Sequence, residues 1–452
     1  MNKIKSFILR LLPLKVWPYQ SEYNDTIKII KETEFLNKDD IHAWQLAKLK
    51  VLINYVWENS KGYREHWKKG GFSPNDLQTL EDIKKIPVIT KEIIRNNIEL
   101  FSIKDSKDIF KVSTGGSTGI PFSFYNSKKH RAIEAGFVDA TWSMYYSAVH
   151  RKSLRTIIRG GVIENGKLYD PLFGLRLSSR NVTVDMVRDF IKSIDNYKTP
   201  ILHVYPSSLY VITKIMLDNQ IDRPKHLFDV ICFGSEPLFS FQLEVINRIF
   251  KEPKSILYGS TEKVVYAANC SQSDKYHIFP QYGVTEIIKE DNTNANFGEL
   301  GEIIGTSFWG LSTPFIRYKT GDMAVVGADK CAACGRDYQT LECIEGRSHE
   351  FVLSKNEKLL SMTYIAGCIH DDIFDTIKQF RFKQERPGYI EFLFVRNSNA
   401  EPDIEDILVR LQSTFGEEYN ITINEVDHIP LTKAGKMTYL DQSINIKKYL
   451  AK

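Results

Sequence analysis

Short apolar runs alternate with amphipathic stretches in the middle of the chain. The apolar runs at 201–205, 230–233 and 255–258 have the length of buried strands, and intervening stretches such as 238–250 have the spacing of helices. Strands that alternate with helices predict an α/β fold whose sheet contains parallel members.

Two polar loops directly follow the second and third of these predicted strands. They are Gly234-Ser235-Glu236-Pro237 and Gly259-Ser260-Thr261-Glu262. Ligands of open α/β sheets bind beyond the carboxyl ends of the strands. Each loop alone is typical of an ordinary strand-to-helix connection, but the two together predict a binding site.

The flanking regions carry other patterns. Residues 39–58 have the apolar spacing of a helix, and Thr90 is placed to cap the start of a second, short helix. Residues 298–326 have the pattern of antiparallel strands, with a tight turn at Gly321-Asp322.

The character of the chain changes after Glu345. We predict a large N-terminal α/β domain over 1–345, with mixed sheets and helices, and a small, mobile α+β domain over 346–452. The predicted elements of the small domain are strands at 351–353, 389–395 and 421–426 and helices at about 365–377 and 403–415.

The segment from Ser113 to Gly119 holds three glycines and four hydroxyl side chains within seven residues. Glycine lets the backbone approach a ligand closely, and consecutive N–H groups form a cradle for anions. The segment lacks the lysine of the P-loop pattern. It predicts either a loop that holds a polyphosphate or a Ser/Thr/Gly-rich surface loop without a ligand.

Composition and charge exclude several classes of protein. The chain of 452 residues is 42% apolar and 26% charged, as in ordinary globular proteins, and its net charge of +4 is small. No dense Lys/Arg stripe indicates nucleic-acid binding, and six cysteines do not make a disulfide scaffold in a chain of this length. We predict a cytoplasmic protein that binds no nucleic acid.

The first residues combine apolar and basic side chains. The stretch 4–14 is too short to cross a bilayer, and Arg10 interrupts it. Together with Lys3, Lys5 and Lys15 it predicts either a peripheral contact with a membrane surface or an amphipathic helix packed on the protein body.

Five motifs follow one another in a recognisable order. They are the loop 113–121, Tyr258-Gly259-Ser260-Thr261-Glu262, Tyr318-Lys319-Thr320-Gly321-Asp322, Gly346-Arg347-Ser348 and Pro430-Leu431-Thr432-Lys433-Ala434-Gly435-Lys436. This series resembles the adenylate-forming superfamily of acyl-CoA synthetases and adenylation domains.

Within that superfamily the chain resembles the phenylacetate–CoA ligase and CapK-like family. The run at 86–95 is similar to that group's N-terminal signature, and residues 234–237 match its Gly-Ala-Glu-Pro loop with one change. The resemblance covers roughly residues 40–440.

The resemblance implies an ATP- and Mg²⁺-dependent, AMP-forming ligase that converts a carboxylic acid to an acyl-adenylate and then transfers the acyl group. Thr261 would contact the α-phosphate, Glu262 would hold Mg²⁺, and Lys436 would bridge the α-phosphate and the carboxylate. The further nucleotide contacts implied by the resemblance are Ser113, Thr114, Gly115, Gly116, Ser117, Thr118 and Gly119 at the β- and γ-phosphates, Ser235, Glu236, Pro237, Tyr258, Gly259 and Ser260 around adenine, Asp322 at the ribose, and Arg347 at ribose or phosphate.

The sequence is compatible with more than one acceptor for the acyl group. The family hinge usually carries an aspartate where this chain has His349, and the loop 354–358 lacks the glycine of members that use CoA. These departures are more similar to the CapK branch, which is associated with surface-polysaccharide synthesis and implies an amine or hydroxyl acceptor, for example on a sugar. The alternatives are a CoA ligase and a non-catalytic nucleotide-binding protein.

A cysteine pair indicates a metal site. Cys331 and Cys334 form a CxxC followed by glycine, which supplies two of the four ligands of a tetrahedral zinc ion. Cys270 and His277 are candidates for the other two, so we expect structural Zn²⁺ at these four residues. The alternative is a set of reduced thiols without a metal.

Overall fold

The structure is a computed structural model of the chain, and it describes residues 3–104, 107–113, 122–159, 163, 166–179, 182–347, 351–362, 365, 376–397, 400–431 and 437–449. The chain divides into two compact units. The first unit comprises Met1–Lys152 and Ser255–Cys343, and the second comprises Ser153–Lys254 and Ile344–Lys452. The predicted domain boundary after residue 345 stays a prediction.

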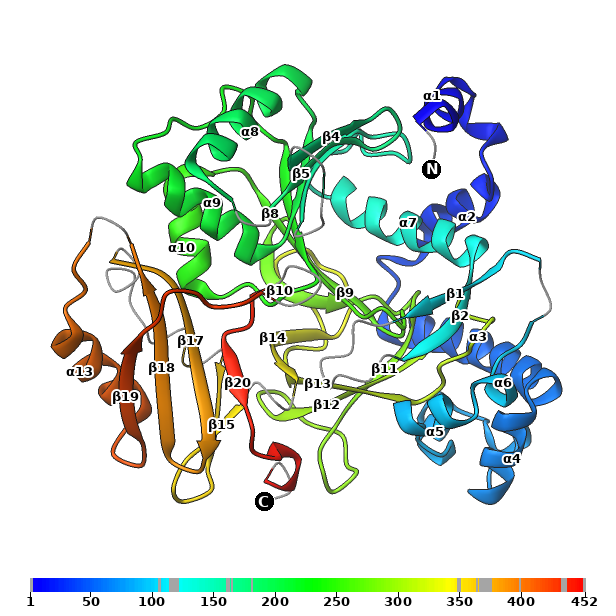
Figure 1. The fold of residues 1–452 in the computed structure, drawn as a ribbon. Coiled ribbons are helices and arrows are strands. Elements are labelled where there is room, and N and C mark those ends of the chain that lie inside the picture. The colour runs from blue at the N-terminus through cyan, green and yellow to red at the C-terminus, as the bar shows by residue number, and fades with distance from the viewer. Residues whose placement is uncertain are drawn as a thin grey trace. The chain divides into compact units, whose positions relative to one another are not determined.

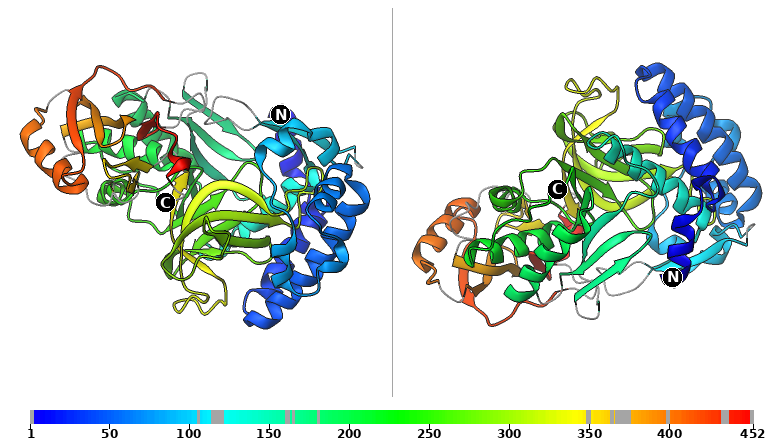
Figure 2. Two further views of the ribbon diagram at one scale, coloured as in Figure 1. Left: turned by 90° about the horizontal axis from the view of Figure 1, so that it is seen from below. Right: turned by 90° about the horizontal axis from the view of Figure 1, so that it is seen from above.

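Helices make up most of the N-terminal part of the first unit and gather beside its strands, in blue and cyan (Figures 1 and 2). None of the helices that the structure describes has both the length and the apolar character needed to cross a lipid bilayer. The helices are α1 (Lys3–Leu11), α2 (Gln20–Thr33), α3 (Lys38–Asn59), α4 (Lys61–Lys69), α5 (Lys91–Asn96), α6 (Ile98–Phe101) and α7 (Lys128–Ser143), with 3₁₀ turns η1 (Leu14–Val16), η2 (Pro74–Asp76) and η3 (Leu80–Lys85).

The strands of the first unit form a hairpin and a larger sheet. The sheet order is β11-β12-β13-β14-β10-β9-β8, and β11–β12, β12–β13, β14–β10, β10–β9 and β9–β8 are antiparallel pairs. The strands are β1 (Ile109–Ser113), β2 (Ser123–Ser127), β8 (Lys254–Gly259), β9 (Tyr266–Cys270), β10 (Ser273–Ile278), β11 (Gly283–Ile288), β12 (Leu300–Ser307), β13 (Tyr318–Val326) and β14 (Thr340–Arg347). The first residue of β8 and residues 344–347 of β14 are counted with the second unit.

The segment predicted to bind phosphate connects the two strands of the hairpin. Strand β1 pairs antiparallel with β2, with Ile109 opposite Ser127 and Ser113 opposite Ser123. Ser113 is the last residue of β1, and the predicted residues 114–119 lie outside the described part of the chain.

The α/β part of the second unit has the order β7-β6-β3-β5-β4. Strands β7, β6, β3 and β5 run parallel, and β4 is antiparallel to β5. Helices α8, α9 and α10 lie together beside these strands (Figure 1). The elements are β3 (Arg155–Arg159), β4 (Lys167–Asp170), β5 (Gly174–Ser178), α8 (Val184–Tyr197), β6 (Ile201–Val204), α9 (Pro206–Asp218), β7 (Val230–Gly234) and α10 (Ser240–Ile249).

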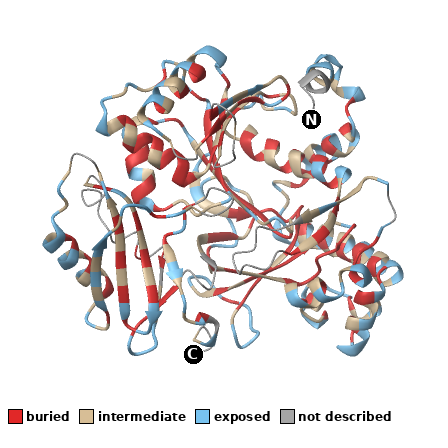
Figure 3. Cartoon of the chain, in the orientation of Figure 1, coloured by how far each residue is buried: buried red, intermediate tan, exposed pale blue. Residues whose placement is uncertain are grey.

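The rest of the second unit holds a four-stranded sheet of order β19-β18-β17-β20 and a short hairpin, β15-β16. Along β17 and β18 buried positions alternate with more exposed ones, as a sheet with one covered face requires (Figure 3). The elements are β15 (Phe351–Leu353), β16 (Leu359–Ser361), β17 (Ile377–Arg386), β18 (Tyr389–Arg396), α13 (Ile404–Phe415), β19 (Asn420–Glu425), β20 (Leu440–Gln442) and the 3₁₀ turn η6 (Ile446–Lys448).

A buried ion pair fixes the segment before α5 against β13. The Arg317 guanidinium lies 3.0 Å from Glu286, and it also donates to the backbone oxygens of Lys84, at 2.7 Å, and Ile86, at 2.8 Å. Ile89 then makes backbone hydrogen bonds on either side of Arg317, to its carbonyl and from the amide of residue 319. These bonds position the residue that follows, Thr90, which caps α5 as predicted.

Candidate functional site

Two residues that the resemblance assigns to the nucleoside meet in the first unit. The Tyr258 hydroxyl, at the end of β8, donates to Asp322 Oδ2 at 2.7 Å. Asp322 is largely buried, and its backbone amide donates to Thr320 Oγ1 at 3.1 Å. The tyrosine and the carboxylate, 64 positions apart in the chain, therefore form one polar group.

Asp322 does not lie on the hairpin turn expected from the sequence. It lies on a bulge inside β13, where the pairing with β12 shifts between Glu302 and Ile304. Gly321 takes a φ of +78°, a left-handed conformation that glycine adopts without steric cost, and its amide donates to Glu302 Oε1 at 3.2 Å. A bulge re-aims a side chain without ending the strand, whereas a tight turn would end it.

Glu262, the expected magnesium ligand, is half-buried in the loop after β8. Its side chain is 10% exposed, and two described side chains approach its carboxylate only at long distances: the Tyr318 hydroxyl at 3.4 Å and Lys91 Nζ at 3.9 Å. Both distances exceed those of strong charge-assisted hydrogen bonds. A shielded carboxylate that has only weak partners within the described part of the chain fits the donor that Mg²⁺ needs, since this ion takes one or two carboxylates beside phosphate oxygens.

Lys91 is a candidate site residue that sequence reasoning missed. It is the first residue of α5, and its ammonium group lies 5.5 Å from the Phe122 ring centroid as well as beside Glu262. The available signal was its place in the family signature at 86–95, directly after the helix cap Thr90. The lysine brings a positive charge next to the end of the hairpin that carries the glycine-rich segment.

Lys263, which follows Glu262, fixes the conformation of the loop after β8. Lys263 has a φ of +57°, donates its amide to Ser260 O at 3.1 Å, and forms a 3.0 Å ion pair with Glu134 of α7. Thr261 is exposed at the tip of this turn. The assignment of Thr261 to phosphate and of Glu262 to magnesium stays a prediction.

The predicted adenine loop follows β7 in the second unit. Ser235 is exposed, with a φ of +70°, and Glu236 Oε2 accepts a hydrogen bond from the Ser207 amide at 3.2 Å. Pro237 follows between β7 and α10. The loop lies beyond the carboxyl ends of parallel strands, where the sequence placed it.

Two further predicted residues cannot be assigned side-chain contacts. Arg347 is the last residue of β14, and only its backbone is described. Lys436 lies outside the described residues. Their roles stay predictions from the sequence.

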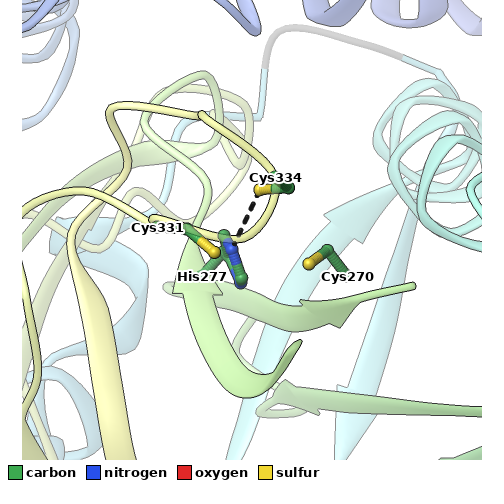
Figure 4. Close-up of side chains that lie close together, drawn as sticks. All are labelled: Cys270, His277, Cys331 and Cys334. Atoms are coloured by element: carbon green, nitrogen blue, oxygen red, sulfur yellow. Dashed lines mark hydrogen bonds between the residues drawn. The ribbon is translucent and has the colours of Figure 1, made fainter. Parts of the chain in front are cut away.

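The four predicted zinc ligands are brought together in the first unit (Figure 4). The ligand atoms of Cys270, His277, Cys331 and Cys334 all lie within 4.8 Å of one another. Cys270 ends β9 and His277 lies on β10, which are paired antiparallel, and the two remaining cysteines come from the connection between β13 and β14.

Local hydrogen bonds orient two of these ligands. His277 Nδ1 lies 3.0 Å from the Lys275 carbonyl, which can only accept, so Nδ1 carries the proton and Nε2 keeps its lone pair. That Nε2 lies 3.4 Å from Cys334 Sγ. The cysteine pair is held in a turn by the bond from the Gly335 amide to Cys331 O at 2.8 Å, with Gly335 at a φ of +78°.

Burial and Arg336 set the ionisation of the quartet. Burial raises the pKa of the Cys270 thiol to about 11 and lowers the pKa of His277, so without a metal both are neutral. Burial alone would raise the pKa of Cys334, but hydrogen bonds from the Arg336 backbone and side chain outweigh it and lower this pKa. Three sulfurs and a neutral imidazole are the donor set of structural zinc sites.

The comparisons with known proteins agree with these motifs. Residues 352–442 match the family model described as the CapK C-terminal domain. The chain is 24% identical over 441 residues to Protein CapK of Staphylococcus aureus, which covers 94% of this chain and 93% of that protein. It is 20% identical over 386 residues to the phenylacetate–coenzyme A ligase of Thermus thermophilus, and the match covers 83% of this chain and 85% of that protein.

The fold is also similar to that of a solved ligase. A crystal structure of 2-hydroxyisobutyryl-CoA ligase, in the postadenylation state with an adenylate, matches with a TM-score of 0.75 over 92% of each chain at 16% identity. The expectation of an α/β fold of the adenylate-forming type is thereby confirmed. The chain has the adenylate-forming fold, and along most of its length its sequence resembles CapK and the phenylacetate–coenzyme A ligases.

Proposed function

We propose that the protein is an ATP-dependent, AMP-forming ligase that activates a carboxylic acid as its acyl-adenylate. The observation that carries this proposal is the meeting of Tyr258 and Asp322 at 2.7 Å, because these are the residues that the family motifs give to adenine and ribose. The similarity to CapK and to phenylacetate–coenzyme A ligases supports the same reaction.

The first unit supplies most of the proposed nucleotide contacts. Asp322 accepts the ribose hydroxyls, and Tyr258 stacks on adenine through its ring. Thr261 donates to the α-phosphate, and the segment 113–119 wraps the β- and γ-phosphates through backbone N–H groups. Gly259 and Ser260 give the loop its close approach to the nucleotide.

Glu262 holds Mg²⁺ in this proposal, and the ion, when bound, neutralises phosphate charge. Lys91 Nζ lies 3.9 Å from Glu262, beyond the length of a tight ion pair, and in this proposal its ammonium turns toward phosphate oxygens. The residue thus adds a positive charge where pyrophosphate charge develops as the α-phosphate is attacked.

The remaining nucleotide contacts that we infer from the family motifs belong to residues of the second unit. Ser235, Glu236 and Pro237 line the adenine base, and Arg347 contacts ribose or phosphate. Lys436 bridges the α-phosphate and the incoming carboxylate, where its charge stabilises the transition state. Use of ATP suits a cytoplasmic enzyme.

The acceptor in the second half-reaction is proposed to be an amine or a hydroxyl, as on a sugar in surface-polysaccharide modification. The segment 354–358, where CoA-using members carry glycine, closes the β15–β16 hairpin, and Glu357 takes the left-handed conformation there at a φ of +61°. The loop is fastened by a 2.7 Å hydrogen bond from Asn356 to Glu418. A pinned loop without glycine offers poor access to a thiol ligand, although CoA stays the second candidate.

The acceptor is identified by comparing which added compound causes AMP release and appears in the acyl product. Purified protein with ATP, magnesium and an accepted acid is supplied with CoA, with glucosamine-type amines, or with neither. The proposal predicts acyl transfer to the amine or hydroxyl compound and none to CoA. Rapid thioester formation would contradict it, and tight ATP binding without turnover of any acid would instead favour a non-catalytic nucleotide-binding protein.

Zinc has a structural role in this proposal, at Cys270, His277, Cys331 and Cys334. The four residues come from β9, β10 and the connection before β14, so an ion would cross-link three parts of the sheet. No reacting group needs to touch it, and its removal should affect stability before chemistry.

The N-terminal segment is proposed to contact the surface of a membrane with anionic lipids. Its backbone is tied to the body by bonds from Trp17 Nε1 to Leu9 O, at 2.8 Å, and from Lys152 Nζ to Leu12 O, at 2.7 Å. Its apolar side chains nevertheless stay exposed, by 41–68%: Phe7, Ile8, Leu11, Leu12 and Val16.

Charge favours the same partner for this segment. Lys3, Lys5, Arg10 and Lys15 are not offset by any acidic residue before Glu22. An apolar face flanked by basic residues suits an interface with anionic lipids. Flotation with vesicles of phosphatidylglycerol or of phosphatidylcholine alone tests this, with Val51→Ser as control because Val51 is an exposed apolar residue elsewhere, on α3.

A further inference from the structure

Three arginines lie on one face of the parallel strands in the second unit. Arg155 and Arg159 occupy alternate positions of β3 and so point to the same face, and Arg176 of β5 is in register with Ile157 between them. His203 of β6 is in register with Ile157 from the other side. The strand pairing thus gathers cationic side chains around one imidazole.

The partners of Arg159 are uncharged groups. Its Nη2 lies 3.1 Å from His203 Nε2, and its guanidinium carbon lies 5.4 Å from the Tyr205 ring centroid. A guanidinium only donates, so His203 Nε2 accepts and the ring is neutral. Burial, together with the charges of Arg159 and Arg155, holds the pKa of His203 well below its usual range, which agrees with a neutral ring.

Within the described part of the chain, three other partly buried arginines have a carboxylate partner, which Arg159 lacks. Arg223, Arg317 and Arg336 each form an ion pair with a glutamate. Among the residues that the structure describes, no carboxylate lies within ion-pair distance of Arg159, and its Nε is buried without an acceptor. A shielded cation without an anion is unfavourable, and a ligand oxygen would satisfy it.

Arg159 also lies at the end of the sheet where ligands bind. It is the last residue of β3, opposite Ser178 at the end of the parallel strand β5. Tyr205, against which its guanidinium packs, directly follows β6, and the nearby charge of Glu236 adds to the burial that raises the pKa of Tyr205. Arg159 therefore packs against Tyr205, whose pKa responds to the charge of Glu236 in the loop proposed to line adenine.

We propose that Arg159 binds a distal carboxylate of the acid substrate, so that the enzyme activates acids whose far end is anionic. This inference rests on the proposed function. The guanidinium offers a planar set of N–H donors that fits a carboxylate, and one of its N–H groups is held by neutral His203, which fixes its orientation. An acid with an apolar tail would leave this cation shielded and unsatisfied.

The test compares acids of equal length with and without the second carboxylate. ATP–pyrophosphate exchange is measured with glutarate and adipate against butyrate and hexanoate, and binding of the same acids without ATP is measured by calorimetry. The proposal predicts higher kcat/KM and tighter binding for the dicarboxylates. Replacing Arg159→Met should lower kcat/KM for dicarboxylates by about 10- to 100-fold and leave the monocarboxylates nearly unchanged.

Matched variants separate recognition from stability. Arg176→Met removes a guanidinium that already lies 4.0 Å from Asp170, and it should keep the preference for dicarboxylates. Arg159→Lys should restore part of the preference. Faster exchange with monocarboxylates in the wild-type protein, or an equal loss for both acid classes in Arg159→Met, overturns the inference while leaving the ligase function intact. Dicarboxylate binding that needs Arg159, without exchange for any acid, would support the site and refute the ligase function.

Discussion

Replacing Cys334→Ser is expected to remove zinc from the first unit. Cys334 Sγ lies 3.4 Å from His277 Nε2, and all four ligand atoms lie within 4.8 Å of one another. Atoms bound to tetrahedral zinc are about 3.5–3.8 Å apart, given bond lengths of about 2.0–2.3 Å. The quartet thus needs to contract by about 1 Å at most, and a serine hydroxyl in place of one sulfur leaves the site a ligand short.

The expected loss of stability follows from linkage. A ligand at about 1,000 times its Kd stabilises the folded state by about 4 kcal/mol. For a unit of this size, 1 kcal/mol shifts Tm by about 2–4 °C, so removing zinc should lower Tm by about 8–16 °C. EDTA should cause the same fall in the wild-type protein.

The assay combines metal analysis with thermal unfolding. Plasma mass spectrometry should find one zinc per wild-type chain and much less in Cys334→Ser, while Cys343→Ser, a cysteine outside the quartet, should keep its zinc. Substitution with Co²⁺ should give the sulfur-to-metal absorption of a thiolate site. Wild-type protein without zinc, whose Tm responds to neither zinc nor EDTA, would refute the reasoning.

Three further results are expected. Arg317→Met leaves the buried Glu286 carboxylate without its cation and should lower the free energy of unfolding in urea by about 3–5 kcal/mol. Adding Glu286→Gln should recover part of this loss, and unchanged stability in Arg317→Met would contradict the prediction. Burial lowers the pKa of His130 to about 4, so between pH 6.5 and pH 4 the unfolded state binds a proton that the folded state does not. The free energy of unfolding should therefore fall by up to about 3 kcal/mol as the pH drops through that window. His130→Asn should flatten this pH dependence, and an unchanged slope would exclude His130 as its source. The double variant Phe7→Ser and Leu11→Ser should abolish flotation with anionic vesicles and leave Tm unchanged. Undiminished flotation would contradict a lipid contact through this face. If the double variant instead converts a dimer to a monomer, the partner of this face is a second copy of the chain.

The parts that the sequence predicted share a strong local signal. Strand β7 is buried at every position and reads as a continuous apolar run, and Thr90 is a helix cap by its own chemistry. The zinc quartet was found because cysteine and histidine spacings are rare enough to be informative. The order of motifs identified the fold for the same reason.

The parts that were missed depend on partners distant in the chain. Strand β3 begins and ends with arginine, so its apolar run is too short to be recognised, and only pairing with β5 and β6 makes it a strand. Residue 377, expected to end a helix, begins β17; the rest of that predicted helix lies mostly outside the described residues. The bulge at Asp322 depends on the register of β12, which local sequence does not encode.

Acid-dependent ATP–pyrophosphate exchange, measured on wild-type protein and on Lys436→Ala, tests the central claim most directly. Loss of the positioned ammonium should reduce exchange by about 10²–10³ while the Kd for ATP stays within a few-fold, because the lysine acts on the transition state. Lys448→Ala, an exposed lysine on η6, should exchange at the wild-type rate. Full exchange in Lys436→Ala, or no exchange by the wild-type protein with any acid, would contradict the account.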